Sequence, residues 1–212
     1  MDIAILLYDG FTALDAVGPY EVLNHLPETK VYFVAKNKGP IITDNKILSL
    51  VADFELSEVL NPDIIVVPGG IAGTLASTKD EIILDWVRTT HRSSQWTTSV
   101  CTGSLILGAA GVLQGLKATT HWFARDFISD FGAEYVNKRF IQEGKIITAA
   151  GVSAGVDMAL HLAKEIAGSD IAETIQLLIE YDPQPPLDSG SLEKASAKTI
   201  EIAKGAVETL MA

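Results

Sequence analysis

Short apolar runs that alternate with helix-like patterns constrain the fold of this chain more than any other feature. Four runs rich in apolar or β-favouring residues predict buried strands at residues 3–8, 31–35, 64–67 and 96–100. Apolar residues at helical spacing predict helices over residues 19–26, 81–92, 105–113, 153–167 and 171–179. Uniformly apolar strands that alternate with helices are typical of a parallel sheet covered on both faces. We therefore expect an α/β fold, a three-layer sandwich around a mostly parallel sheet.

The remaining patterns extend this architecture without dividing it. Two short runs flank Glu143-Gly144 and predict a small hairpin added to the sheet, with strands at residues 140–142 and 145–148. Residues 182–190 are too rich in proline for a helix and are interpreted as a linker. Beyond it, a last amphipathic helix is predicted over residues 192–210, with Ser191 as its N-cap. We expect one domain over the whole chain, 1–212, ending in this linker and helix.

Charge and composition exclude several classes of function. The chain has a net charge of −11 and no basic cluster, so its surface repels phosphate groups and a nucleic-acid partner is not expected. No apolar run reaches the ~18 residues that span a membrane, and the first residues lack the features of a signal peptide. A single cysteine cannot form an internal disulfide, which fits a reducing compartment. We therefore expect a cytoplasmic protein that binds neither nucleic acid nor a membrane.

The single cysteine lies in a turn between a predicted strand and a predicted helix. Ser99-Val100-Cys101-Thr102-Gly103 has small residues two positions before and after the cysteine, which is the spacing of a nucleophile elbow. Such a turn places the sulfur at the carboxyl edge of the sheet, where open α/β folds bind ligands. It also directs helical N–H groups at the sulfur, and we expect them to lower the pKa of the thiol. The alternative is that Cys101 is a small buried hydrophobic residue.

A second turn at this edge is rich in glycine. The segment VPGGIAG, residues 67–73, closes the third predicted strand, and in a parallel sheet it reaches the same edge as Cys101. We expect backbone N–H groups at Gly69 and Gly70 to approach a ligand and stabilise developing negative charge, as an oxyanion hole does. An ordinary strand-to-helix loop is the alternative.

Two residues are candidates for proton transfer with the cysteine. Asp15 follows the first predicted strand in an apolar segment, where burial without a cationic partner raises the pKa of a carboxyl. The alternative is a capping box, because Thr12 precedes Asp15 by three residues at a helix start. Among the histidines only His121 is a plausible base. We expect solvated side chains at His25 and His91 and a structural role for His161.

Several segments together resemble one superfamily. The segments are LDAVGPYEVL, VVPGG, TSVCTGSLILGAAGVLQG, KATTHW, GVSAGVD and QLLIEYDPQPP. On these residues the chain is identified as a member of the ThiJ/PfpI superfamily, the class I glutamine-amidotransferase-like α/β proteins, along essentially its whole length. Within this superfamily it is most similar to the isonitrile hydratases. The resemblance implies a flavodoxin-like sandwich and a homodimer.

The resemblance also implies roles for individual residues. Cys101 would be the nucleophile, Asp15 the acid and base, and Thr102 a helper beside the sulfur. Many relatives carry Glu where Asp15 stands, and the shorter side chain leaves room for a water or a substrate atom. Relatives with peptidase-like or amidotransferase chemistry carry His directly after the cysteine, so Thr102 argues against both activities.

The implied reaction is hydration of an isonitrile to an N-substituted formamide through a cysteine thioimidate. It requires no metal or organic cofactor, and the sequence shows no His/Cys cluster to hold one. Because the substrate is small and nearly apolar, we expect an apolar pocket, with Ile71, Trp122 and Val152 as walls and His121 beside them. Ordinary core packing is the alternative for each wall residue.

Three other functions fit parts of the pattern. A redox or stress-response protein would oxidise a low-pKa thiol at the same elbow, although such relatives usually carry Glu in place of Asp15. The ligand domain of a transcription regulator is a second alternative, but the acidic chain argues against DNA binding. A glyoxalase-like enzyme would use the same thiolate on an aldehyde.

Overall fold

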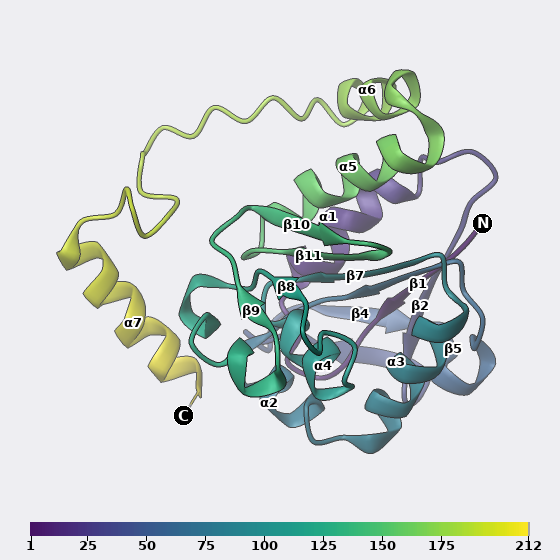
Figure 1. Ribbon diagram of the computed structural model, residues 1–212, viewed down its shortest axis with the longest axis horizontal. Coiled ribbons are helices and arrows are strands. Elements are labelled where there is room, and N and C mark those ends of the chain that lie inside the picture. Colours follow the sequence, from purple (N-terminus) through teal and green to yellow (C-terminus); the bar gives the residue numbers. More distant parts are fainter. Residues whose placement is uncertain (212) are drawn as a thin grey trace.

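A seven-stranded sheet forms the centre of the computed structural model, which describes residues 1–211 (Figure 1). The strand order is β10-β11-β7-β6-β1-β2-β5, and paired strands are parallel except β10, which is antiparallel to β11. The strands are β1 (Asp2–Leu6), β2 (Lys30–Ala35), β5 (Phe54–Glu55), β6 (Ile64–Val67), β7 (Trp96–Val100), β10 (Phe140–Glu143) and β11 (Ile146–Ala149). The predicted parallel sheet and its added hairpin are confirmed.

The register of the central strands aligns their carboxyl ends. Ile3 of β1 pairs with Val31 of β2 and with Ile64 of β6. The side chains of β6 are buried on both faces of the sheet, which explains its uniformly apolar sequence. Because β1, β6 and β7 run in the same direction, the loops that follow them meet at one edge.

Helices cover both faces of the sheet (Figure 1). On one face α1 (Ala13–Leu23) packs against α5 (Ala154–Ala167), and α6 (Ser169–Leu178) packs against α5. On the other face lie α2 (Ile71–Ser77), α3 (Glu81–Ser93) and α4 (Gly103–Ala109). The predicted three-layer sandwich is confirmed.

The first helix differs most from its prediction, since α1 begins at Ala13 rather than at Pro19. Gly18 and Pro19 lie inside the helix, where both residues lower intrinsic helix stability. The tertiary contact with α5 explains why the helix nevertheless forms. A Cβ atom at Gly18 would lie 3.2 Å from Cγ2 of Val156, so the glycine allows close approach of the two helices. Packing outweighs propensity here.

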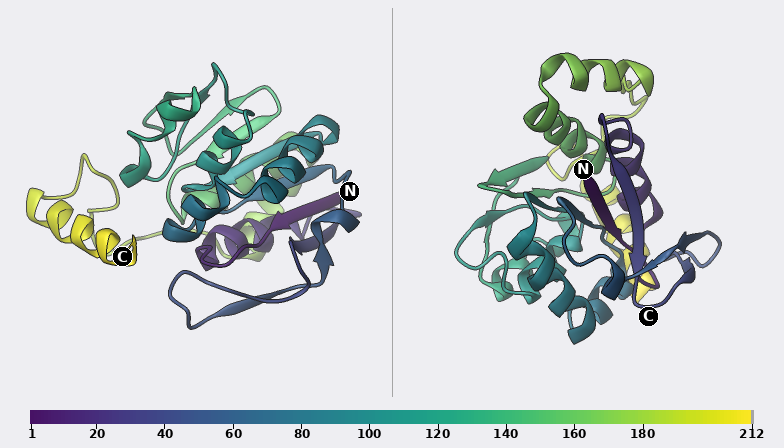
Figure 2. Two further views of the ribbon diagram at one scale, coloured as in Figure 1. Left: turned by 90° about the horizontal axis from the view of Figure 1, so that it is seen from below. Right: turned by 90° about the vertical axis from the view of Figure 1, so that its right-hand side faces the viewer.

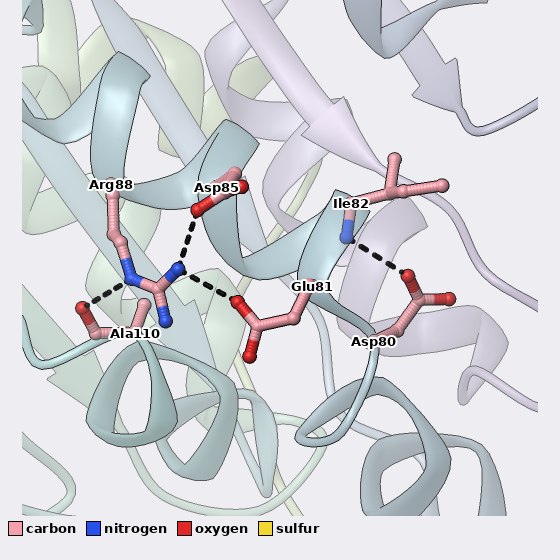
Figure 3. A network of polar contacts seen from close by, with 6 residues as sticks. All are labelled: Asp80, Glu81, Ile82, Asp85, Arg88 and Ala110. Atoms are coloured by element: carbon pink, nitrogen blue, oxygen red, sulfur yellow. Dashed lines mark hydrogen bonds and ion pairs between the residues drawn. The ribbon is translucent and has the colours of Figure 1, made fainter.

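A polar network holds α3 against the end of α4 (Figure 3). Asp80 caps the first turn of α3, and Arg88 lies 3.0 Å from Glu81 and 2.5 Å from Asp85. The Nε of Arg88 also donates to the carbonyl oxygen of Ala110 at 3.4 Å. Exposed ion pairs of this kind contribute about 1 kcal/mol or less each. The network therefore orients α3 beside α4 more than it stabilises the fold.

Several short elements were not predicted from the sequence. Two of them, the edge strand β5 and the helix α2, are described above. The others are the antiparallel pair β3 (Gly39–Ile42) and β4 (Ser49–Ala52), the parallel pair β8 (Lys117–Ala118) and β9 (Glu134–Tyr135), and the 3-10 helices η1 (Leu56–Glu58), η2 (Trp122–Ala124) and η3 (Ile128–Phe131). The half-exposed strands β3 and β4 lack a continuous apolar run. Their hairpin is joined to the loop after β1, where Gly10 N–H donates to Ile42 and Asp44 N–H donates to Phe11.

The C-terminal segment reaches a separate position beyond the sheet (Figure 2). Residues 182–190 are exposed and belong to no helix or strand, and α7 (Ala197–Met211) then packs against α2. The predicted start of this helix after Ser191 is wrong. The helix begins after Ser196, whose Oγ accepts the N–H of Thr199 at 3.1 Å, because residues 191–195 form bends and turns. None of the helices within residues 1–211 is long and apolar enough to cross a membrane.

Candidate active site

Cys101 occupies the predicted elbow between β7 and α4. Its φ of 58° lies in the left-handed region that non-glycine residues rarely adopt and that often marks functional sites. The backbone N–H of Cys101 lies 3.1 Å from the carbonyl oxygen of Ala149 and 3.0 Å from that of Ala150. A side chain at Gly103 would collide with the carbonyl oxygen of Val67, so the turn requires glycine there.

The surroundings of the sulfur disfavour the thiolate. Burial raises the pKa of the Cys101 thiol well above its ordinary value, and the negative charge of Asp15 raises it further. Backbone N–H groups of Thr102 and Val152 interact with the sulfur and lower the pKa in part. The predicted lowering of the cysteine pKa is therefore wrong, because desolvation outweighs the helical N–H groups. Cys101 rests as a neutral thiol.

Asp15, in the first turn of α1, is fully buried beside the cysteine. Its Oδ2 accepts the N–H of Gly69 at 3.0 Å, while its Oδ1 has no hydrogen-bond partner within residues 1–211. Burial raises the pKa of Asp15 from 3.8 to about 7, although Gly69 and the Cys101 thiol lower it. The capping-box alternative is wrong, because the Thr12 hydroxyl donates to Asp44 at 2.6 Å and does not cap α1. The expected rise in the Asp15 pKa is confirmed.

The N–H groups of Gly69 and Gly70 bind protein atoms rather than facing the cavity. Gly69 donates to Asp15, and Gly70 donates to Oγ1 of Thr102 at 3.0 Å. The oxyanion hole expected at these two glycines is therefore not formed; their N–H groups instead orient a carboxyl and a hydroxyl. A Cβ atom at Gly69 would lie 2.6 Å from the Thr102 nitrogen and 2.9 Å from Oδ2 of Asp15, so this position has no room for a side chain.

Buried hydroxyl groups continue the network from Thr102. Its Oγ1 lies 2.8 Å from Oγ1 of Thr74, which lies 3.0 Å from the phenol oxygen of Tyr8. Sequence reasoning missed both Tyr8 and Thr74. A usable signal existed for Tyr8, since it follows the first predicted strand and so reaches the same edge as Cys101. No sequence pattern pairs Thr74 with it.

A cavity of about 220 Å³ beside Cys101 brings several predicted site residues together. Cys101, Thr102, Ile71, Val152 and His121 all line it. Its remaining walls, mostly apolar, are formed by Thr12, Asp44, Thr74, Leu75, Leu105, Phe123, Ala124, Phe127 and Val207. Among residues 1–211, no group of three or more His, Cys, Asp or Glu side chains is arranged to hold a metal ion.

Trp122 is the predicted wall residue that lies elsewhere. It lines an adjoining cavity of about 300 Å³ that contains Arg125 and Arg139, and it is not part of the cavity beside Cys101. The 3-10 turn η2 explains the difference, because successive side chains of a turn point in different directions. Phe123, the next residue, lines the cysteine cavity instead.

Of the four histidines, His121 lines the cavity beside Cys101, while His91 and His161 make structural hydrogen bonds elsewhere. Burial lowers the pKa of His121. Its ring is tilted by 40° against that of Trp122 and makes no hydrogen bond to Cys101 in the described part of the chain. His161 bonds to β10, which agrees with a structural role, and His25 is exposed as expected. His91 is half-buried with its Nδ1 2.9 Å from the hydroxyl of Thr97, so its predicted solvation is wrong.

The fold and the site define a class of protein: a flavodoxin-like α/β sandwich with a cysteine at a strand–helix elbow and a buried carboxyl beside it. Comparison with known proteins narrows this class. The model of the DJ-1/PfpI family matches residues 1–165, and the chain belongs to this family.

Individual relatives agree with the family. Isonitrile hydratase from Pseudomonas putida is 42% identical over 205 residues, which cover 96% of this chain and 89% of that protein. The crystal structure of a ThiJ/PfpI family protein from Pseudomonas syringae superposes with a TM-score of 0.92 at 38% identity, covering 99% of this chain and 88% of the other. DJ-1beta from Drosophila melanogaster shares the fold alone, with a TM-score of 0.77 at 21% identity over 84% of this chain and 97% of the other.

Proposed function

We propose that this protein is an isonitrile hydratase, which converts an isonitrile and water to an N-substituted formamide through a covalent adduct on Cys101. Similarity to the Pseudomonas putida enzyme supports the reaction. The observation that carries the mechanism is the fully buried Asp15 beside the thiol, with a pKa raised to about 7. Such a carboxyl exchanges protons readily at neutral pH.

The first step joins sulfur to the terminal carbon of the isonitrile. The Cys101 thiol transfers its proton to the Asp15 carboxylate as sulfur attacks, and Asp15 delivers this proton to the same carbon. The product is a thioimidate, Cys–S–CH=N–R. Because the thiol is neutral at rest, Asp15 both activates the nucleophile and protonates the substrate.

The second step hydrolyses the adduct. The Asp15 carboxylate takes a proton from water as the water oxygen attacks the thioimidate carbon. Asp15 passes this proton to the nitrogen, which gives the tetrahedral adduct Cys–S–CH(OH)–NH–R. The C–S bond then breaks as the hydroxyl proton passes to the sulfur, and R–NH–CHO leaves. Thr102, at the cavity wall beside the sulfur, is placed to orient the water.

The cavity walls favour a small apolar substituent on the substrate. Ile71, Val152 and Val207 supply aliphatic surface, and His121 is kept neutral by the lowered pKa that burial causes. Asp44 is the charged residue of this lining, and its carboxylate is engaged by Thr12. A redox-sensing role is less well supported, since a raised cysteine pKa lowers the thiolate fraction that oxidants require.

Formamide production from cyclohexyl isocyanide tests the proposal. We expect wild-type turnover, and loss of nearly all activity in Cys101→Ala and in Asp15→Asn. Asp130→Asn, which changes an exposed carboxyl, is the matched control and should retain wild-type turnover. Turnover that persists in Cys101→Ala would reject covalent catalysis. Absence of wild-type turnover on any isocyanide would reject the function.

We also propose that the protein acts as a homodimer in the cytoplasm. The exposed leucines Leu177, Leu178 and Leu187 offer apolar surface of the kind that a partner covers. Light scattering after size exclusion should give twice the mass of one chain. A monomer at micromolar concentration would reject the dimer.

A further inference from the structure

A line of buried hydroxyl groups leads from the interior of the protein to Thr102. The phenol oxygen of Tyr8 lies 2.8 Å from the carbonyl oxygen of Pro68 and 3.0 Å from Oγ1 of Thr74. Oγ1 of Thr74 lies 2.8 Å from Oγ1 of Thr102, which lies 3.1 Å from the carbonyl oxygen of Gly70. Tyr8, Thr74 and Thr102 are all buried, so their hydroxyl groups must satisfy one another.

These four contacts share three hydroxyl hydrogens, so one contact lacks a hydrogen. Each hydroxyl group donates one hydrogen, and neither carbonyl group donates any. Burial raises the pKa of Tyr8 well above its ordinary value, so its phenol stays protonated. The two contacts at 2.8 Å are too short for oxygen atoms without a hydrogen between them. Tyr8 therefore donates to Pro68, and a hydrogen lies between Thr74 and Thr102.

Two arrangements of the other hydrogens remain, and they differ at Thr102. In the first, Thr74 donates to the Tyr8 oxygen and Thr102 donates to Thr74. Thr102 then accepts only the N–H of Gly70 and keeps one lone pair free. In the second, Thr74 donates to Thr102 and Thr102 donates to the Gly70 carbonyl group. Its two lone pairs are then both used, and it has no capacity left for another donor.

We propose that Tyr8 is a positioning residue: it accepts the hydrogen of Thr74 and so keeps a lone pair of Thr102 free to bind the attacking water. Both arrangements contain the same number of internal hydrogen bonds. A water that donates to Thr102 adds one more bond in the first arrangement alone, and Thr102 and Thr74 both line the cavity. The first arrangement needs the phenol oxygen of Tyr8 as acceptor. Without it, Thr74 turns its hydrogen to Thr102 and saturates it.

This inference rests on the proposed hydration and concerns its second step. Formation of the thioimidate uses no water, so loss of the phenol oxygen should leave that step unchanged. Hydrolysis should slow, because the water loses one orienting hydrogen bond. For Tyr8→Phe we expect kcat with cyclohexyl isocyanide to fall about tenfold while kcat/KM stays within about twofold. Mass spectrometry of samples quenched during turnover should show that a larger fraction of Tyr8→Phe than of wild type carries the added mass of the substrate.

Variants at the next hydroxyl separate orientation from packing. In the Tyr8→Phe protein, Thr74→Val keeps the side-chain shape and removes the hydroxyl that saturates Thr102, so it should recover hydrolysis. Thr74→Ser in the same Tyr8→Phe background keeps a hydroxyl at this position, so the adduct should still accumulate. Tyr32→Phe, at a tyrosine away from the cavity, is the matched control and should behave as wild type.

The outcomes distinguish this inference from the function on which it rests. Adduct accumulation in Tyr8→Phe that is relieved by adding Thr74→Val, but not by adding Thr74→Ser, supports the positioning role. Accumulation that persists in Tyr8→Phe/Thr74→Val overturns it. If the wild type hydrates isonitriles but Tyr8→Phe shows no excess adduct, this inference is overturned and the proposed function stands. That conclusion is the same whether kcat of Tyr8→Phe is unchanged or falls in parallel with kcat/KM. Failure of the wild type to hydrate isonitriles overturns the proposed function and this inference with it.

Discussion

Replacement of Asp15 by Asn should change how the stability of this protein depends on pH. Burial raises the pKa of Asp15 from 3.8, its value in an unfolded chain, to about 7 in the folded protein. Between these values the unfolded chain has lost the proton while the folded protein keeps it. The unfolded state then binds fewer protons, so the free energy of unfolding falls as pH rises. The protonated Asp15 therefore contributes its full share of stability to the folded protein below pH ~4. This share falls as pH rises and is lost once pH passes 7.

The magnitude follows from the separation of the two pKa values. Each pKa unit corresponds to about 1.36 kcal/mol, so ionisation of Asp15 costs the folded protein about 4 kcal/mol in full. At pH 5 the carboxyl is already ionised in the unfolded chain but still protonated in the folded protein, so part of this loss of stability has already occurred. Between pH 5 and pH 8 the wild type should therefore lose about 2–3 kcal/mol relative to Asp15→Asn, which has no carboxyl to ionise.

Urea unfolding of both proteins at pH 5 and pH 8 measures this difference. The comparison cancels other groups, including His121, whose lowered pKa has the opposite effect on the pH dependence. Asp130→Asn, at an exposed carboxyl, is the control and should change the free energy of unfolding equally at both pH values. If Asp15→Asn also shows no pH-dependent difference from wild type, the carboxyl does not have a raised pKa and cannot serve as the proposed proton carrier.

Two further predictions concern the groups around this carboxyl. Gly69→Ala places a Cβ atom 2.6 Å from the Thr102 nitrogen, so we expect about 1–3 kcal/mol of destabilisation in urea unfolding together with loss of turnover. Gly205→Ala, in an open position of α7, should instead leave the fold intact or stabilise it slightly, and equal effects of the two changes would contradict the steric argument. Asp44→Asn removes a negative charge that raises the pKa of Asp15. If the change of turnover rate with pH near 7 reports the ionisation of Asp15, it should move to lower pH in this variant. A profile that stays in place or moves upward would contradict that assignment.

Much of the fold could be predicted from the sequence because its signals are local. The strands β6 and β7 lie at the predicted residues, since short runs of apolar or β-favouring residues that end in a turn leave few other structures. The elbow at Cys101 was predicted for the same reason, because small residues at fixed spacing are needed in a tight strand-to-helix turn. The start of α1 was not predicted, since it depends on contact between Gly18 and α5.

The same distinction between local signals and tertiary contacts applies to the site. The sequence by itself determined that Cys101, Asp15 and Thr102 reach one edge of a parallel sheet, because chain direction and turn position are enough to place them there. The tertiary structure alone decided the protonation of Cys101, the partners of the Gly69 and Gly70 N–H groups, and the line of hydroxyls from Tyr8. Each of these depends on desolvation or on hydrogen-bond partners that are distant in the chain, and such contacts exist only once the layers have packed.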